Sequence, residues 1–137
     1  MNYLWPGQAQ WETFTRRFGD TAPLTMLNLL RYREHADYTG YPDEVPCSGR
    51  DAYRRYAARV IPCLQTHGAR LVFAGAAGAA LIGPDSEYWD DVLLVEYPSL
   101  PVFRDMLESE GYREFAYHRT AALQDSRLIP VGASEWV

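Results

Sequence analysis

The chain has 137 residues, a length that suits one domain with its own hydrophobic core. Hydrophobic residues make up 47% of it and charged residues 23%, which excludes a disordered or low-complexity chain. The formal net charge is −5, so we expect no nucleic-acid partner. All 13 basic residues are Arg, and a chain without Lys offers no Schiff-base amine and no phosphate-binding P-loop.

The sequence shows no targeting or membrane segment. Its first residues contain neither a positively charged segment nor an apolar run, so no secretory signal is expected. The longest apolar stretch, 71–82, is shorter than the roughly 20 residues of a membrane-spanning helix. We therefore expect a cytoplasmic protein without a membrane partner. Cys47 and Cys63 have no metal-ligand spacing, so free thiols are expected.

The first half of the chain predicts two helices and one strand. An amphipathic helix is indicated by apolar residues at helical spacing before Gly19, namely Trp11, Phe14 and Phe18. Segment 23–33 is apolar on both faces, which predicts a core strand covered on both sides. A long loop over 34–47 has the length of a lid or binding loop. Ser48, with Asp51 three residues later, predicts the start of the next helix.

The second half predicts three strands and a divided helix. Segment 69–83 is expected to be a strand interrupted near 75–78, and 89–97 the next strand, after a turn at 84–87. A helix is expected to open at Pro98 and Ser99, to break at Gly111 and to continue over 112–124. The last strand is predicted over 125–131. The element order is a helix followed by βαββαβ.

This order predicts an α+β class protein with a ferredoxin-like antiparallel sheet and two helices on one sheet face. The alternative, a parallel sheet with crossover helices, conflicts with the mere turn between the second and third strands. The other sheet face needs a cover, and a second copy of the chain would supply it as a homodimer. The expected units are an N-terminal helical extension (1–21), the ferredoxin-like domain (22–131) and a C-terminal tail (132–137).

Arg119 is the most informative polar residue, because it lies in the middle of the apolar face of the last predicted helix. A guanidinium in that position keeps its charge and needs an anion or several carbonyls. Two interpretations stay open. Arg119 pairs with a carboxylate such as Asp90, Glu96 or Asp125, or it points into a cavity and binds the carboxylate of a small ligand.

Other candidates follow from polar side chains on apolar elements. We expect His118 and Asp90 to transfer protons, with Arg119 binding the substrate. The remaining substrate-binding candidates are Asn28, Arg31, Tyr53 and Trp89. Each has a structural alternative: a surface pair with Glu114 for His118, a strand-end acceptor for Asp90 and plain core for Tyr53. The three His residues are isolated, so no metal site and no cofactor are expected.

Four stretches together resemble the uncharacterised family known as domain of unknown function number 1330, in the dimeric α+β barrel superfamily. They are MLNLLRYR (26–33), SGRDAYRRYA (48–57), WDDVLLVEYPS (89–99) and GYREFAYHRTAALQDSRLIP (111–130). The resemblance covers about residues 22–131 and implies a ferredoxin-like fold whose two sheets close into a barrel across the dimer. It implies no reaction. The wider superfamily includes cofactor-free monooxygenases, isomerase-like proteins, haem enzymes and stress-related proteins.

Three functional hypotheses follow. The first is a small-molecule-binding protein that acts as a cofactor-independent enzyme on a small apolar or aromatic acid. The second is a non-catalytic ligand-binding or stress-associated homodimer, in which the same polar residues dock helix and sheet. The third is a haem protein with His118, His67 or His35 as axial ligand. The first requires Arg119 to bind a ligand, the second requires it to dock helix and sheet, and the third requires bound haem.

Overall fold

A computed structural model describes residues 2–133 of the protein. Its elements in chain order are α1 (Gln8–Phe18), β1 (Leu24–Tyr32), α2 (Gly49–Thr66), β2 (Arg70–Ala76), β3 (Asp91–Tyr97), α3 (Leu100–Glu108), α4 (Glu110–Phe115), α5 (Tyr117–Ala122) and β4 (Leu123–Val131). The four strands form one antiparallel sheet in the order β2-β3-β1-β4. The predicted α+β class and ferredoxin-like order are confirmed, and the parallel alternative is excluded.

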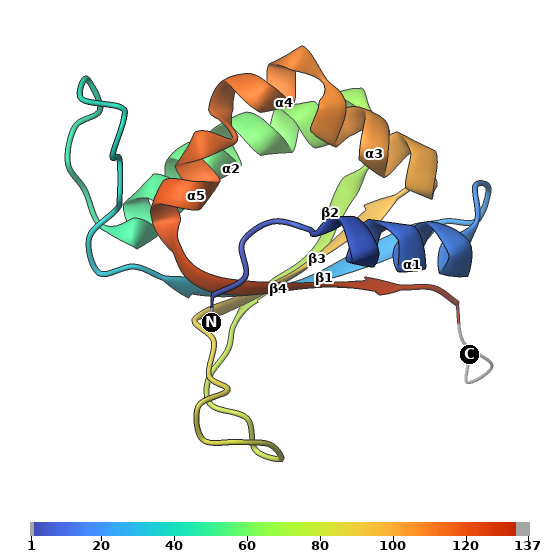
Figure 1. The fold of residues 1–137 in the computed structure, drawn as a ribbon, viewed down its shortest axis with the longest axis horizontal. Helices are drawn as coiled ribbons and strands as arrows, with labels where there is room; N and C mark the ends of the chain where they lie inside the picture. The colour runs from blue at the N-terminus through green and yellow to red at the C-terminus, as the bar shows by residue number, and fades with distance from the viewer. Residues whose placement is uncertain (1, 134–137) are drawn as a thin grey trace.

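Helices α2 to α5 lie on one face of the sheet (Figure 1). Alternate residues of the central strand point toward them, and Leu24, Met26 and Leu30 are almost completely buried there. Phe103 and Met106 of α3 close the core from the helical side. Strand alternation thus places one apolar row of β1 in the core and leaves the next row on the opposite face.

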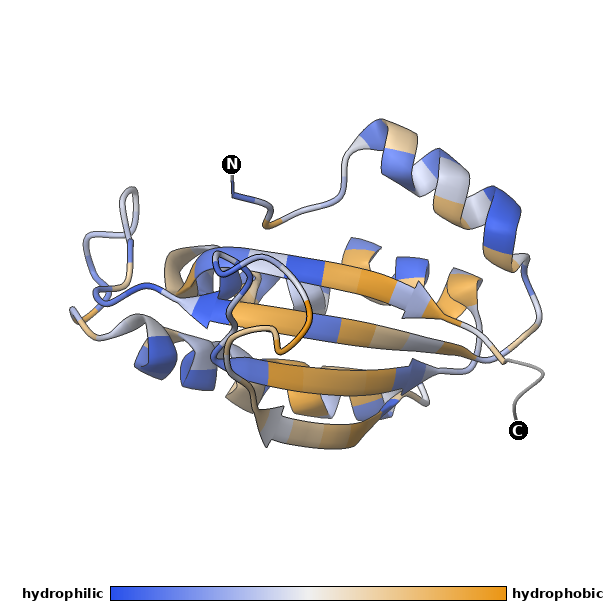
Figure 2. Cartoon of the chain, turned by 90° about the horizontal axis from the view of Figure 1, so that it is seen from below, coloured by the Kyte–Doolittle hydropathy of each residue, from blue (hydrophilic) through white to orange (hydrophobic). Residues whose placement is uncertain are grey.

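No helix of residues 2–133 lies on that opposite face, for which a second copy of the chain is the expected cover. Phe73, Leu94, Leu27 and Ile129 pair side by side across all four strands on this face. Figure 2 views the sheet from this side and shows apolar residues along the middle strands. Phe73 and Ile129 are exposed, so the face is apolar and open to solvent in a single subunit.

The predicted boundaries hold near α2 and shift elsewhere. The hydroxyl oxygen of Ser48 accepts a hydrogen bond from the backbone N–H of Asp51 at 3.0 Å, which confirms the predicted cap. β2 has a register shift between Leu71 and Phe73. It ends at Ala76, and Ala79 then pairs with Tyr88 in an isolated bridge, so the expected interruption lies at 77–78. β3 begins at Asp91, two residues later than expected, because Trp89 and Asp90 belong to the preceding loop.

The last predicted helix is shorter than expected and divided. α4 ends at Phe115, α5 ends at Ala122, and β4 starts at Leu123 instead of 125. No helix within residues 2–133 is long and apolar enough to cross a membrane. Of the predicted C-terminal tail, 134–137 lie outside the described residues.

Candidate functional site

A cleft of about 1910 Å³ lies between the sheet, the helix layer and the N-terminal segment. Its floor is the helix-facing side of the sheet, and its far wall is formed by α2 and the helices that follow β3. α1 and the residues before it lie along its side, next to β4 (Figure 1). The cleft is therefore bounded by segments from both ends of the chain.

Strand register determines the order of side chains on the cleft floor. Ser126 and Asp91 both pair with Leu30 and occupy one end of the floor. Two residues further along come Leu128, Asn28 and Leu93, and then Pro130, Met26 and Val95. The floor is polar at one end, carries the single amide of Asn28 next, and is apolar beyond it.

Arg119 reaches this polar end from α5. Its side chain is 6% exposed, and its Nη1 donates to the backbone carbonyl of Leu4. Nη2 donates to the hydroxyl oxygen of Ser126 at 3.4 Å, a long hydrogen bond. The guanidinium carbon lies 4.9 Å from the ring centroid of Trp5. Arg119 is thus a buried cation in the wall of the cleft, held by neutral groups.

None of the carboxylates proposed as partners of Arg119 contacts it, and no ion pair of Arg119 occurs within residues 2–133. Asp90 accepts a hydrogen bond from the backbone N–H of Tyr32 at 2.8 Å. Glu96 pairs with Arg70 at 3.2 Å. Asp125 pairs with Arg127 at 2.9 Å. Each predicted partner is already engaged elsewhere, so the structural ion-pair interpretation of Arg119 is wrong.

Tyrosine side chains line the cleft beside Arg119. Tyr53 and Tyr56 of α2 have ring centroids 5.2 Å apart, and the hydroxyl groups of Tyr56 and Tyr112 share a hydrogen bond of 2.9 Å. Burial raises the pKa of Tyr53 to about 12, and the positive charge of Arg119 partly offsets that rise. These phenols stay protonated at neutral pH and are hydrogen-bond donors.

The N-terminal segment crosses the polar end of the cleft and is held there by four contacts. The backbone N–H of Tyr3 donates to Asp125 at 2.8 Å, and the carbonyl of Tyr3 accepts from Ser126 at 2.5 Å. The indole N–H of Trp5 donates to Thr120 at 2.9 Å. With the Arg119 bond to the Leu4 carbonyl, these contacts define residues 3–5 as a strap over the guanidinium.

Asp91 lines the cleft, although the residue predicted from the sequence was its neighbour Asp90. Its carboxylate accepts hydrogen bonds from the hydroxyl of Tyr32 at 2.6 Å and from Arg50 at 3.2 Å. Asp91 and Ser126 flank Leu30 in one row, so their Cα atoms lie ~10 Å apart across two strand spacings. The alternation of side chains along a strand could have indicated Asp91 from the sequence, because Asp91 shares one strand face with Leu93 and Val95. Asp90 precedes the strand in the structure.

His118 does not point into the cleft, although it adjoins Arg119 in sequence. Its Nδ1 shares a hydrogen bond of 2.7 Å with the hydroxyl of Tyr38, and its Nε2 lies 3.9 Å from a carboxylate oxygen of Glu44. Burial lowers the pKa of His118, although the nearby carboxylate of Glu44 acts in the opposite direction. Glu114 instead pairs with Arg59 at 3.6 Å. Successive helix residues point about 100° apart, so His118 fixes the 33–48 loop while Arg119 faces the sheet.

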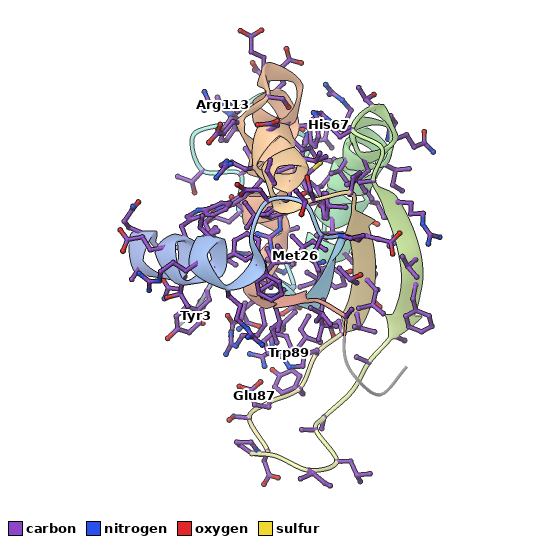
Figure 3. The ribbon with its side chains drawn as sticks, turned by 90° about the vertical axis from the view of Figure 1, so that its right-hand side faces the viewer. Tyr3, Met26, His67, Glu87, Trp89 and Arg113 are labelled. Carbon is purple, nitrogen blue, oxygen red and sulfur yellow. The ribbon has the colours of Figure 1, made fainter. Side chains whose placement is uncertain are left out.

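Arg31 and Trp89 lie on the open side of the sheet, away from Arg119. The guanidinium carbon of Arg31 is 4.8 Å from the Trp89 ring centroid, and its Nη2 donates to the carbonyl of Tyr88 at 2.8 Å. Figure 3 shows Trp89 and Glu87 below the sheet and Met26 above it. The structure therefore brings Arg119, Asn28 and Tyr53 together in the cleft and separates them from His118, Asp90, Arg31 and Trp89.

No cluster of His, Cys, Asp and Glu suited to a metal ion occurs in residues 2–133. Cys47 and Cys63 are free and partly buried. The cleft offers the carboxylate of Asp91, the side-chain amides of Asn28 and Gln10, several phenols and five guanidinium groups, of which those of Arg50, Arg54 and Arg127 are paired with carboxylates. These groups bind anions, donate hydrogen bonds and exchange protons.

The strand order and the one-sided helix layer define a ferredoxin-like α+β protein with a ligand-sized cleft between its layers. The family model for a domain of unknown function, DUF1330, matches residues 44–132, and the chain belongs to this family. A crystal structure of a protein of unknown function from Rhodopseudomonas palustris is 36% identical, with a TM-score of 0.85 over 98% of this chain and 99% of that one.

Two further structures are similar. That of the methylated form of the same protein is 35% identical, with a TM-score of 0.86 over 98% of this chain and 97% of that one. An uncharacterized NIPSNAP domain protein from Burkholderia xenovorans is 9% identical, with a TM-score of 0.50 over 84% of this chain and 97% of that one, and shares the fold alone. No curated protein matches the chain.

Proposed function

We propose that the protein binds a small apolar or aromatic acid in the cleft, with Arg119 as the anchor for its carboxylate. The observation that carries this proposal is the burial of Arg119 without a carboxylate partner within residues 2–133. A buried guanidinium held only by neutral groups is poorly compensated. A ligand carboxylate supplies the missing negative charge and accepts two parallel hydrogen bonds.

The neighbours of Arg119 suit such a ligand. Tyr53 presents a protonated hydroxyl group beside the guanidinium, and its aromatic ring extends the wall of the cleft. Asn28 carries an amide on the floor, and its Nδ2 donates to the carbonyl of Met26 at 3.3 Å. Polar groups thus converge at one end of an apolar cleft, as they do in small-molecule sites.

Calorimetric titration with benzoate and its neutral analogue benzamide tests this function. We expect the wild type to prefer benzoate by about 10- to 100-fold, as charge-assisted hydrogen bonds predict. Arg119→Gln should abolish the preference. Arg113→Gln is the matched control, because Arg113 is exposed on α4, outside the cleft. Equal binding of benzoate by wild type and Arg119→Gln would refute the proposed role of Arg119 in binding the carboxylate.

A second candidate function, a cofactor-independent enzyme acting on the same acid, rests on Asp91. Its carboxylate lies on the cleft floor with Tyr32 and Arg50 as hydrogen-bond donors. A carboxylate near an anchored substrate is positioned to hold or move a proton. Asp91→Asn should bind the acid as the wild type does but lose its conversion, measured by mass spectrometry of the incubated ligand. Unchanged conversion would exclude this role.

We propose further that two copies of the chain pair through the open sheet face. The row of Phe73, Leu94, Leu27 and Ile129 is apolar across the whole sheet, and a second identical sheet is the simplest cover for it. Sedimentation equilibrium should show a dimer. Leu27→Arg places a charge at the centre of this face and should give a folded monomer. Val45→Arg, in the exposed 33–48 loop, should remain dimeric.

A further inference from the structure

We propose that the acid held in the cleft is an amphipathic monocarboxylate with an extended aliphatic tail, of the medium-chain fatty-acid class. This proposal rests on the proposed function, because Arg119 is its anchor for the carboxylate. It adds the direction and the chemistry of the rest of the ligand. The tail extends from Arg119 along β4 toward α1.

The first support is the shape of the cleft floor. Ser126, at the Arg119 end, and Pro130 lie four residues apart on the same face of β4, a distance of ~14 Å along an extended strand. Leu128 lies between them, faces the helix layer and is nevertheless 37% exposed. A compact ring at Arg119 would leave this apolar floor in contact with water.

The second support is the wall at the far end of the cleft. α1 presents Trp11, Phe14 and Phe18 to the cleft, and the ring centroid of Trp11 lies 5.9 Å from that of Phe103. No residue of α1 is fully buried, so its apolar stripe is incompletely covered by the chain itself. An aliphatic tail along the floor would complete the burial of these rings and would hold α1 against the body of the domain.

The third support is size together with charge. The cleft, of about 1910 Å³, exceeds the roughly 300–1000 Å³ of sites for compact drug-sized ligands. Arg119, which has no carboxylate partner within residues 2–133, lies at one end, and the other end is lined mostly by apolar side chains from β1, β3, β4 and α1, with Arg17 of α1 among them. A long space with a buried cation at one end and a mostly apolar lining beyond it is complementary to a molecule with one anionic head and an apolar tail.

A chain-length series tests this proposal. Hexanoate, octanoate and decanoate are titrated into the full-length protein, with quenching of Trp fluorescence as the signal. We expect affinity to rise roughly fourfold for each added methylene, as burial of apolar surface predicts. Leu128→Asp should remove this gain, so that decanoate binds no more tightly than hexanoate. Leu81→Asp, a fully exposed site outside the cleft, is the control and should retain the gain.

Failure of this proposal can be distinguished from failure of the proposed function. If benzoate binding depends on Arg119 but hexanoate and decanoate bind equally, the extended tail is refuted and the acid-binding function stands. If Arg119→Gln binds every acid as the wild type does, both are refuted. If decanol binds as tightly as decanoate, the carboxylate has no anchor, and both are refuted again.

Discussion

The indole of Trp5 covers the guanidinium of Arg119 at 4.9 Å and donates its N–H to Thr120 on the same helix. One aromatic side chain near the N-terminus therefore fastens the strap of residues 3–5 to α5. The strap uses Nη1 of Arg119 for the carbonyl of Leu4. Each Nη carries two N–H groups, so a ligand carboxylate can bind both Nη atoms beside that carbonyl, with the strap and the ligand on the same guanidinium.

Weakening the strap should loosen the whole N-terminal segment. We expect Trp5→Ala to increase the rate of tryptic cleavage after Arg16 or Arg17 several-fold, because α1 has no fully buried residue to hold it in place. The rate is measured by mass spectrometry of timed digests. Tyr41→Ala, which removes an exposed aromatic residue from the 33–48 loop, is the control. Identical digestion rates for wild type and Trp5→Ala would show that the strap does not restrain α1.

Loss of Arg119 should cost little stability. We expect Arg119→Gln to lower the free energy of unfolding by about 1–2 kcal/mol, because it removes hydrogen bonds to neutral oxygens of Leu4 and Ser126. Breaking a buried ion pair would cost about 3–5 kcal/mol. Urea denaturation measures the difference. A loss in the higher range would mean that Arg119 is structural and would weaken the case for an anchor.

The sequence was sufficient to predict the strand order and the position of Arg119. The cap at Ser48 is a local pattern, and it is reproduced in the structure. The prediction of which candidate site residues lie close together was less accurate. His118 and Arg119 are neighbours in sequence but point about 100° apart around α5, toward Tyr38 of the loop and toward the strap respectively.

What could not be predicted depends on contacts between distant segments. The strap joins residue 3 to residues 125 and 126, and no local pattern around Tyr3 indicates this pairing. The choice between Asp90 and Asp91 depended on where β3 begins, and strand boundaries are set by the partner strand. Because β3 starts at Asp91, its carboxylate faces the cleft and that of Asp90 caps β1.

Docking of the 33–48 loop should depend on pH through His118. Burial lowers the pKa of His118 from its ordinary value of 6.5, so the folded protein favours the neutral imidazole despite the nearby Glu44. The unfolded chain then binds more protons below that value. The corresponding stability is complete above pH 6.5 and is lost as the pH falls below it.

The urea midpoint of the wild type should therefore decrease from pH 7.5 to pH 5 by more than that of His118→Gln. His35→Gln is the control, because the His35 side chain is 87% exposed and should leave the pH profile unchanged. Parallel profiles for wild type and His118→Gln would show that His118 does not couple the loop to pH.

The loop of residues 77–90 should contribute to the proposed dimer. It extends below the sheet, on the side without helices (Figure 1), and Leu81 and Ile82 at its end are 100% and 96% exposed. Arg31 holds the base of the loop through the carbonyls of Ser86 and Tyr88, at 3.1 and 2.8 Å. The loop is fixed by hydrogen bonds from Arg31 and exposes Leu81 and Ile82 beside the apolar sheet face, so it is suited to contact a second subunit.

We expect the double variant Leu81→Asp with Ile82→Asp to raise the dimer dissociation constant at least tenfold in sedimentation equilibrium, without a change in far-ultraviolet circular dichroism. Asp85→Asn, in the same loop, should leave association unchanged. An unaltered dissociation constant for the double variant would place the end of the loop outside the interface.

The most direct test of the central claim is a crystal structure of the protein with decanoate bound. We expect the carboxylate within hydrogen-bond distance of both Nη atoms of Arg119 and the tail along Leu128 and Pro130. A carboxylate bound away from Arg119, or decanoate lying only on the open face of the sheet, would contradict it.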